Sequence, residues 1–414
     1  MTGTVPELSA TEPADASAAA RDPEVLPLHG DVGVRRFFLI HAMATTFPLV
    51  AGFMLYGWRA LLAVTLVLAG AGVGLAVFRR VGKRGRRIGM MRGWWMAILL
   101  ALTMPAHLAS PTYPGAPTSA LIWPLLPAAG MALALLLWVF AGVGSGRVHP
   151  VPVIYLLMVV MFQPLMVPHF VLHRERVAGG DLVDADLPQP PGPGELPLVP
   201  KEAWTASADI PLRDAIHTNP AALQLVTFTT GRQTPAREAL SLEELLRDTM
   251  PPLEDLIVGG APAPLGLGSA VAVIMGGLFL IYRGMLDFRV PLLMSLAAIA
   301  ALAVLPIPVS VTEGIRHWRT LAFHAGVGWP VAITFISYEL MAGPLLFTAF
   351  YLAAAPGVRP MSRRGRATFA VMVGFTAATL QLYLDVSQGP YLALLIGGLL
   401  TPLLDRLFKP RPLV

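Results

Sequence analysis

The sequence predicts an all-α integral membrane protein of about ten transmembrane helices, arranged as two inverted halves of five helices each. Three observations predict this fold. Of the 414 residues, 55% are hydrophobic and only 13% are charged, about half the charged fraction of a soluble domain. Ten apolar stretches are each long enough to cross a bilayer. One long polar stretch separates the first five from the last five.

Each candidate span is a largely apolar stretch of about 20 residues, the length that crosses the hydrocarbon core as a helix. Because each half holds an odd number of spans, the two halves run in opposite directions, and this predicts an inverted repeat. The spans are 37–56, 60–78, 93–110, 119–141 and 151–170 in the first half, and 266–286, 289–309, 328–353, 366–384 and 389–406 in the second.

These spans divide the chain into five parts. Residues 1–32 are rich in Ala, Pro and acids, which predicts a disordered cytoplasmic tail without a signal peptide. The two five-helix halves occupy 33–170 and 265–408. The polar segment 171–264 connects them, and 409–414 form a second short tail.

Basic residues predict which ends of the spans face the cytoplasm. The loop after the second span carries seven basic residues between 79 and 92, and short basic loops face the cytoplasm. Alternation then places Arg147, Arg289 and Arg366 on the same side, with both termini in the cytoplasm and the segment 171–264 outside. This distribution of basic loops accounts for the net charge of +5. The charge therefore does not indicate nucleic-acid binding, and we expect the chain to be surrounded by membrane lipid.

Two irregular stretches interrupt the apolar pattern. Gly142 and Gly144 follow the fourth span, and Gly343 precedes a proline inside the eighth. Glycine lets a planar ligand or another backbone approach closely, and proline breaks the helical hydrogen-bond ladder. The pattern therefore predicts either contact with a ligand or a turn and a kinked packing helix.

Glu339 is the one carboxylate well inside a predicted span. A charged side chain at membrane depth costs about 2.5–3.5 kcal/mol or more, so Glu339 is a candidate for an ion or proton pathway. The alternative is a carboxylate near the interface, paired with Arg316 or Arg319. The nine histidines lack ligand spacing and the chain has no cysteine, so we expect neither a metal site nor a cysteine-ligated cluster.

Four stretches carry a resemblance to a known family, the RnfD/NqrB membrane subunits of the Rnf and Na⁺-translocating NADH:quinone oxidoreductase complexes. In order along the chain they are "FAGVGSGRVHPVPVIYLLMVVMFQP", "APLGLGSAVAVIMGGLFLIYRGMLDFRVPL", "GPLLFTAFYLAAAPGVRPMSRRGR" and "GPYLALLIGGLLTPLLDRL". Together they cover roughly 140–407, while the first four spans fit mainly by number.

The resemblance implies one FMN, joined through its phosphate to a threonine of the outer segment, and a second flavin, riboflavin, within the membrane. The family's attachment motif ends in a Thr followed by Pro. Here "TTGRQTPA" fits it with one inserted residue and makes Thr234 the acceptor, whereas "DAIHTNPAAL" leaves Thr218 as the alternative. Two polar side chains of the family are replaced by Ala355 and Leu267.

The same resemblance implies the activity. The chain is expected to be a subunit of a redox-driven ion-pumping oxidoreductase, a translocase of the bacterial cytoplasmic (inner) membrane, which relays electrons between partner subunits of an Rnf/Nqr-like complex. Two other functions fit the sequence. One is an inverted-repeat channel or transporter for a small solute or ion, lined at 142–146 and at Gly343. The other is a divergent scaffold subunit that has lost its flavin.

Overall fold

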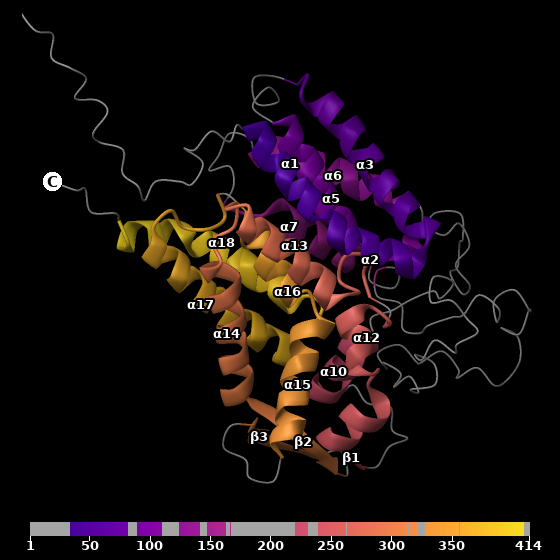
Figure 1. Cartoon of the computed structure of the whole chain (residues 1–414), viewed down its shortest axis with the longest axis vertical. Coiled ribbons are helices and arrows are strands. Elements are labelled where there is room, and N and C mark those ends of the chain that lie inside the picture. Colours follow the sequence, from indigo (N-terminus) through magenta and orange to yellow (C-terminus); the bar gives the residue numbers. More distant parts are fainter. Residues whose placement is uncertain are drawn as a thin grey trace, which may run out of the picture.

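The computed structural model (Figure 1) is largely helical. The residues that it describes are 34–81, 89–109, 124–140, 147–162, 166, 220–230, 239–261, 263–312, 315–321, 328–355 and 357–409.

Apolar helices follow the predicted spans in both halves. In the first half they are α1 (Val34–Ala44), α2 (Thr46–Tyr56), α3 (Trp58–Phe78), α5 (Met90–Thr103) with the short η2 (Ala106–Ala109), α6 (Leu125–Phe140) and α7 (Pro150–Met161). In the second half they are α13 (Ala270–Tyr282), α14 (Arg289–Val304), α15 (Trp329–Ala342), α16 (Leu345–Phe347), the π-helical turn η9 (Thr348–Leu352), α17 (Arg363–Tyr383) and α18 (Gly389–Leu407).

The lengths of these helices test the predicted spans only in part. Within the described residues, three helical segments are long and apolar enough to cross a membrane, namely Arg35–Tyr56, Trp58–Phe78 and Gly389–Leu407. The bent pair formed by α15 and the α16–η9 segment makes a fourth, and five shorter helices of 10–17 residues are also apolar. The structure therefore confirms a helical protein with several apolar helices, and the total of about ten crossings stays a prediction.

The packing repeats between the two halves. In the first half α3 packs along α6, and in the second half α14 packs along α17. Each pair joins the second and fourth helical segments of its half. Glycines bring the helices close, because a Cβ at Gly130 would overlap the carbonyl oxygen of Val67 and a Cβ at Gly374 that of Met294. This correspondence is what an inverted repeat would produce.

A small β-sheet departs from the expected all-α fold. Strands β1 (Ala239–Ser241), β2 (Pro306–Thr312) and β3 (Ile315–Thr320) form an antiparallel sheet in the order β1-β2-β3. The predicted span 289–309 accordingly ends as a helix at Val304. Pro306 and Pro308 have no N–H to continue a helix, and alternating Ile307, Val309 and Val311 favour a strand.

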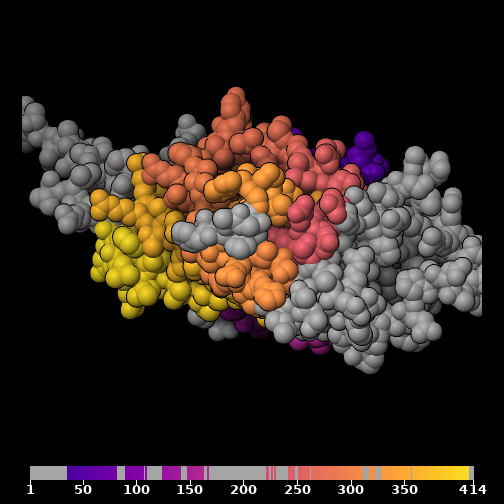
Figure 2. All heavy atoms as spheres, turned by 90° about the horizontal axis from the view of Figure 1, so that it is seen from below, coloured from indigo at the N-terminus to yellow at the C-terminus, as the bar shows by residue number. Residues whose placement is uncertain are grey.

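The sheet places the connecting segment beside the second half. Strand β1 belongs to the 171–264 segment, and β2 follows α14, so their pairing puts both on one side of the helices. Seen from below in Figure 2, the red atoms of this segment and the orange atoms of α15 adjoin on one face. The predicted alternation of the loops also places the 171–264 segment and the loop after the span 289–309 on one side of the membrane. The segment also contains α10 (Pro220–Thr230), α11 (Leu242–Glu244), η7 (Leu245–Thr249) and α12 (Leu253–Val258).

Candidate ion site and the two ends of helix α17

A break in the eighth predicted span lies beside a buried polar pair of the second half. Helix α15 ends at Ala342, Gly343 has an extended backbone conformation, and the chain resumes at Leu345 with a bend of 61°. Pro344 causes the break because it lacks an N–H and disfavours helical backbone angles at the preceding residue. The break ends the hydrogen-bond ladder of α15 at this point.

Glu339 lies in this last turn and is completely buried, with 0% of its surface exposed. Its hydrogen-bond partner is Gln381 of α17, which is itself 1% exposed. The Gln381 Nε2 donates to the main-chain oxygen of Glu339 at 2.8 Å and to its Oε2 at 3.3 Å. An amide side chain, and not a cationic one, thus holds the buried carboxylate.

Two oxygen atoms of this pair have no partner among the described residues: Oε1 of Glu339 and Oε1 of Gln381. The orientation of the Gln381 amide is fixed by its donation to the main-chain oxygen of Glu339, since the flipped amide would place two oxygens 2.8 Å apart. Both open atoms are acceptors. Buried acceptors normally find a partner, so this site is built to receive a donor or a cation.

Gly343 serves close packing at the same place. A Cβ at Gly343 would lie 2.6 Å from the main-chain oxygen of Val386 and 3.3 Å from Nε2 of Gln381. Glycine is therefore needed for the approach of the α17–α18 connection. Asp385 in that connection accepts from the N–H of Ser387 at 2.6 Å and from Gln388 Nε2 at 3.2 Å, so it organises the turn.

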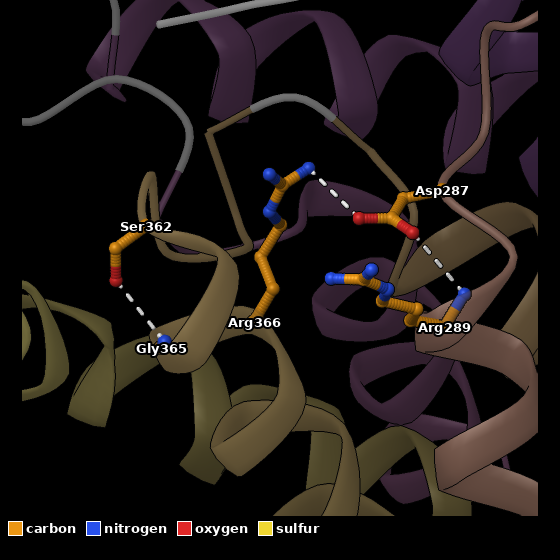
Figure 3. Close-up of polar contacts among 5 residues, drawn as sticks. All are labelled: Asp287, Arg289, Ser362, Gly365 and Arg366. Atoms are coloured by element: carbon orange, nitrogen blue, oxygen red, sulfur yellow. Dashed lines mark hydrogen bonds and ion pairs between the residues drawn. The ribbon is translucent and has the colours of Figure 1, made fainter. Parts of the chain in front are cut away.

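The opposite end of α17 carries an ion pair (Figure 3). Arg366 binds Asp287, in the connection between α13 and α14, at 3.1 Å. Asp287 also accepts from the N–H of Arg289 at 3.2 Å. The Ser362 hydroxyl accepts from the N–H of Gly365 at 3.0 Å and caps the start of α17. Nearby, burial lowers the pKa of Arg359 to about 10; the Arg366 charge also lowers this pKa and Asp287 raises it.

Helix α17 separates the two polar contacts by most of its length. From Arg366 to Gln381 the helix rises by about 22 Å. Beyond Gln381, the Tyr383 hydroxyl donates to the main-chain oxygen of Pro306 at 2.8 Å, beside the sheet. Helix α10 packs against both α15 and α17. The Glu339–Gln381 pair therefore lies toward the sheet end of the helices, on the side of the connecting segment.

The structure describes only two of the predicted site residues. Glu339 and Gly343 come together at the break in the eighth span. The other predicted site residues lie outside the described residues: Thr234, Thr218, Gly142 and Gly144. Among the residues that the structure does describe, no group of three or more His, Cys, Asp or Glu could hold a metal ion.

The partner of Glu339 differs from the one that the sequence suggested. Of the two alternative partners, Arg319 does not pair with Glu339, because its side chain is exposed on β3, and the side chain of Arg316 lies outside the described part of the chain. Gln381 takes the place of a cationic partner and was not among the predicted site residues. A glutamine in an otherwise apolar predicted span was a usable signal for it.

Nearly the whole chain matches one protein family. A model of the NQR2, RnfD, RnfE family matches residues 27–413. The chain belongs to this family. The resemblance of the four sequence stretches is thereby confirmed.

Relatives in the family belong to ion-translocating redox complexes. The D subunit of the ion-translocating oxidoreductase complex of Halorhodospira halophila is 27% identical over 391 residues, covering 93% of this chain and 92% of that protein. The D subunit of the Na⁺-translocating ferredoxin:NAD⁺ oxidoreductase complex of Acetobacterium woodii is 26% identical over 50% of this chain and 52% of its own length. The proton-translocating counterpart from Clostridium ljungdahlii is 26% identical over 37% of this chain and 41% of its own length.

The sequence resemblance puts apolar side chains at two positions where the family pattern has polar ones. Ala355 is buried at 1% exposure, and Leu267 packs against the core. Neither side chain can bind an ion or carry a proton. The buried side-chain oxygens of the second half that lack a partner among the described residues belong to Glu339, Gln381, Thr348 and Tyr391.

Proposed function

We propose that this protein is the flavin-carrying membrane subunit of an ion-translocating electron-transport complex and relays electrons between partner subunits. The observation that carries the proposal is the family match over residues 27–413, supported by a relative from such a complex that covers 93% of the chain. The protein then acts as part of a redox enzyme in the bacterial inner membrane, with both termini in the cytoplasm.

The flavin attachment is assigned to the segment beside the sheet. Thr218 precedes α10 by two residues and Thr234 follows it by four. In the sequence, the two candidate threonines therefore flank α10, which has 11 residues. A phosphoester-linked FMN would supply the redox chemistry, and the chain's hydroxyl would fix its position. We propose Thr234 as the acceptor, followed in the chain by β1 of the sheet.

A pair of matched variants tests the attachment. The full-length protein is purified from its native host, precipitated with acid and examined for flavin fluorescence on the denatured band. Thr234→Val removes the hydroxyl with little change in shape, so it should abolish the covalent flavin signal, while Thr218→Val should retain it. The opposite pattern would move the acceptor to Thr218.

The absence of covalent flavin in the unmutated protein, in a host that flavinylates related subunits, would overturn the flavin assignment. The scaffold function would then account better for Ala355 and Leu267, since a subunit without its cofactor has no need of polar side chains there. Co-purification of partner subunits would separate this outcome from loss of the whole complex.

A further inference from the structure

Among the described residues, the Glu339–Gln381 pair is a buried carboxylate site without a cationic side chain. Glu339 is 0% exposed, its Oε2 is held by Gln381, and its Oε1 has no partner among the described residues. The ion pair between Arg366 and Asp287 is at the other end of α17. A buried, uncompensated carboxylate is strongly unfavourable, so its charge must be balanced by something that binds.

Two helix ends add to the negative potential at this place. Glu339 is three residues from the end of α15 at Ala342, and Gln381 is two residues from the end of α17 at Tyr383. The carboxyl end of a helix carries a partial negative charge from its aligned peptide dipoles. Two such ends therefore converge on one carboxylate, and broken helices that expose carbonyl oxygens are a recurring way to bind cations in membrane proteins.

The open atoms favour a metal cation over a proton. A proton on Oε1 of Glu339 would neutralise the carboxylate but would leave Oε1 of Gln381 without a partner among the described residues. A cation bound by both oxygens would serve both. One carboxylate with otherwise neutral oxygen donors matches a single positive charge, whereas divalent ions draw on more carboxylates.

We propose that the side-chain oxygens of Glu339 and Gln381 bind one alkali-metal cation, Na⁺ or K⁺, at the end of α15. That this cation is the transported ion rests on the proposed function. The binding of the cation does not depend on that function. Because α10 packs against both α15 and α17, the site lies under the element that joins the two candidate flavin threonines.

Cation binding is measured on the full-length protein, in its purified complex, without any redox assay. The melting temperature is recorded in choline chloride and then with NaCl or KCl substituted at constant ionic strength. A ligand that binds only the folded state raises the melting temperature, and we expect a rise of about 2 °C or more with at least one of the two salts. Equilibrium binding of the same cation should give one ion per chain.

Variants locate the bound ion. Glu339→Gln keeps the shape of the side chain and should weaken binding by about tenfold or more, with loss of the thermal shift. Gln381→Met removes the amide oxygen and should weaken it as well, which keeps the test usable if one variant fails to fold. Glu243→Gln makes the same chemical change at an exposed residue and should leave binding unchanged.

Three results would overturn the proposal: no effect of either salt on the unmutated protein, a cation effect that survives in Glu339→Gln, or a stability change with pH alone that Glu339→Gln removes. The last would identify a proton site. A protein that binds the cation but carries no flavin would contradict the proposed function and leave the cation site standing. A flavin-loaded protein without cation binding would do the reverse.

Discussion

Each end of α17 contacts a carboxylate from another part of the chain, and the two carboxylates differ in the charge of their partners. At the start of the helix, Asp287 faces Arg366 at 3.1 Å, and their side chains are 19% and 11% exposed. Near its far end, Glu339 is completely buried and receives the neutral amide of Gln381. The first carboxylate is neutralised by Arg366, and the second has no cationic partner among the described residues.

The difference separates a structural contact from a functional one. An ion pair with some access to water stabilises the junction of α13, α14 and α17, with little left to bind anything else. A buried carboxylate held by an amide keeps its charge available to an external partner, at a cost in stability. Three predictions test this contrast, from the largest expected effect to the smallest.

The two ends of α17 should lie on opposite faces of the membrane. The chain has no cysteine, so single cysteines can be introduced at exposed positions: Met361→Cys beside the start of α17 and Glu243→Cys beside the sheet. In intact cells an impermeant maleimide should label Glu243→Cys and leave Met361→Cys unlabelled, because basic loops face the cytoplasm. Labelling of Met361→Cys alone would reverse the orientation.

Breaking the ion pair should lower stability. Asp287→Asn leaves the partly buried Arg366 guanidinium without its counter-charge, and we expect a loss of about 1–3 kcal/mol in the free energy of unfolding. The measurement is an SDS titration of the full-length protein in mixed micelles. The double variant with Arg366→Gln should lose less than the sum of the two single variants; strict additivity would show that the pair contributes nothing as a pair.

Neutralising Glu339 should have a small effect of the opposite sign. In choline buffer free of alkali-metal ions, Glu339→Gln removes an uncompensated buried charge and keeps an oxygen for Gln381 to bind. The free energy of unfolding should stay equal or rise by about 1 kcal/mol at most. A loss as large as that of Asp287→Asn would make Glu339 a structural residue like Asp287.

Particular residues show how far the sequence predicts this protein. The apolar stretches predicted where the helices lie, because lipid-facing helices need continuous apolar residues whatever their neighbours are. Gly343 and Pro344 predicted the break in the eighth span, since their backbone constraints are local. The β-sheet was not predicted, because the paired residues of β1 and β2 are 69 to 73 positions apart in the chain and a three-residue strand has no distinctive pattern.

The sequence by itself determined the family, the helical segments and one buried acid worth attention, because these depend on composition, periodicity and short motifs. Only the tertiary structure decided what surrounds that acid. Glu339 and Gln381 are 42 residues apart in the chain, and whether Arg319 or Gln381 faces Glu339 depends on how α15 and α17 pack. The charge balance of a buried group is a property of its neighbours in space, and the packing of helices distant in sequence sets those neighbours.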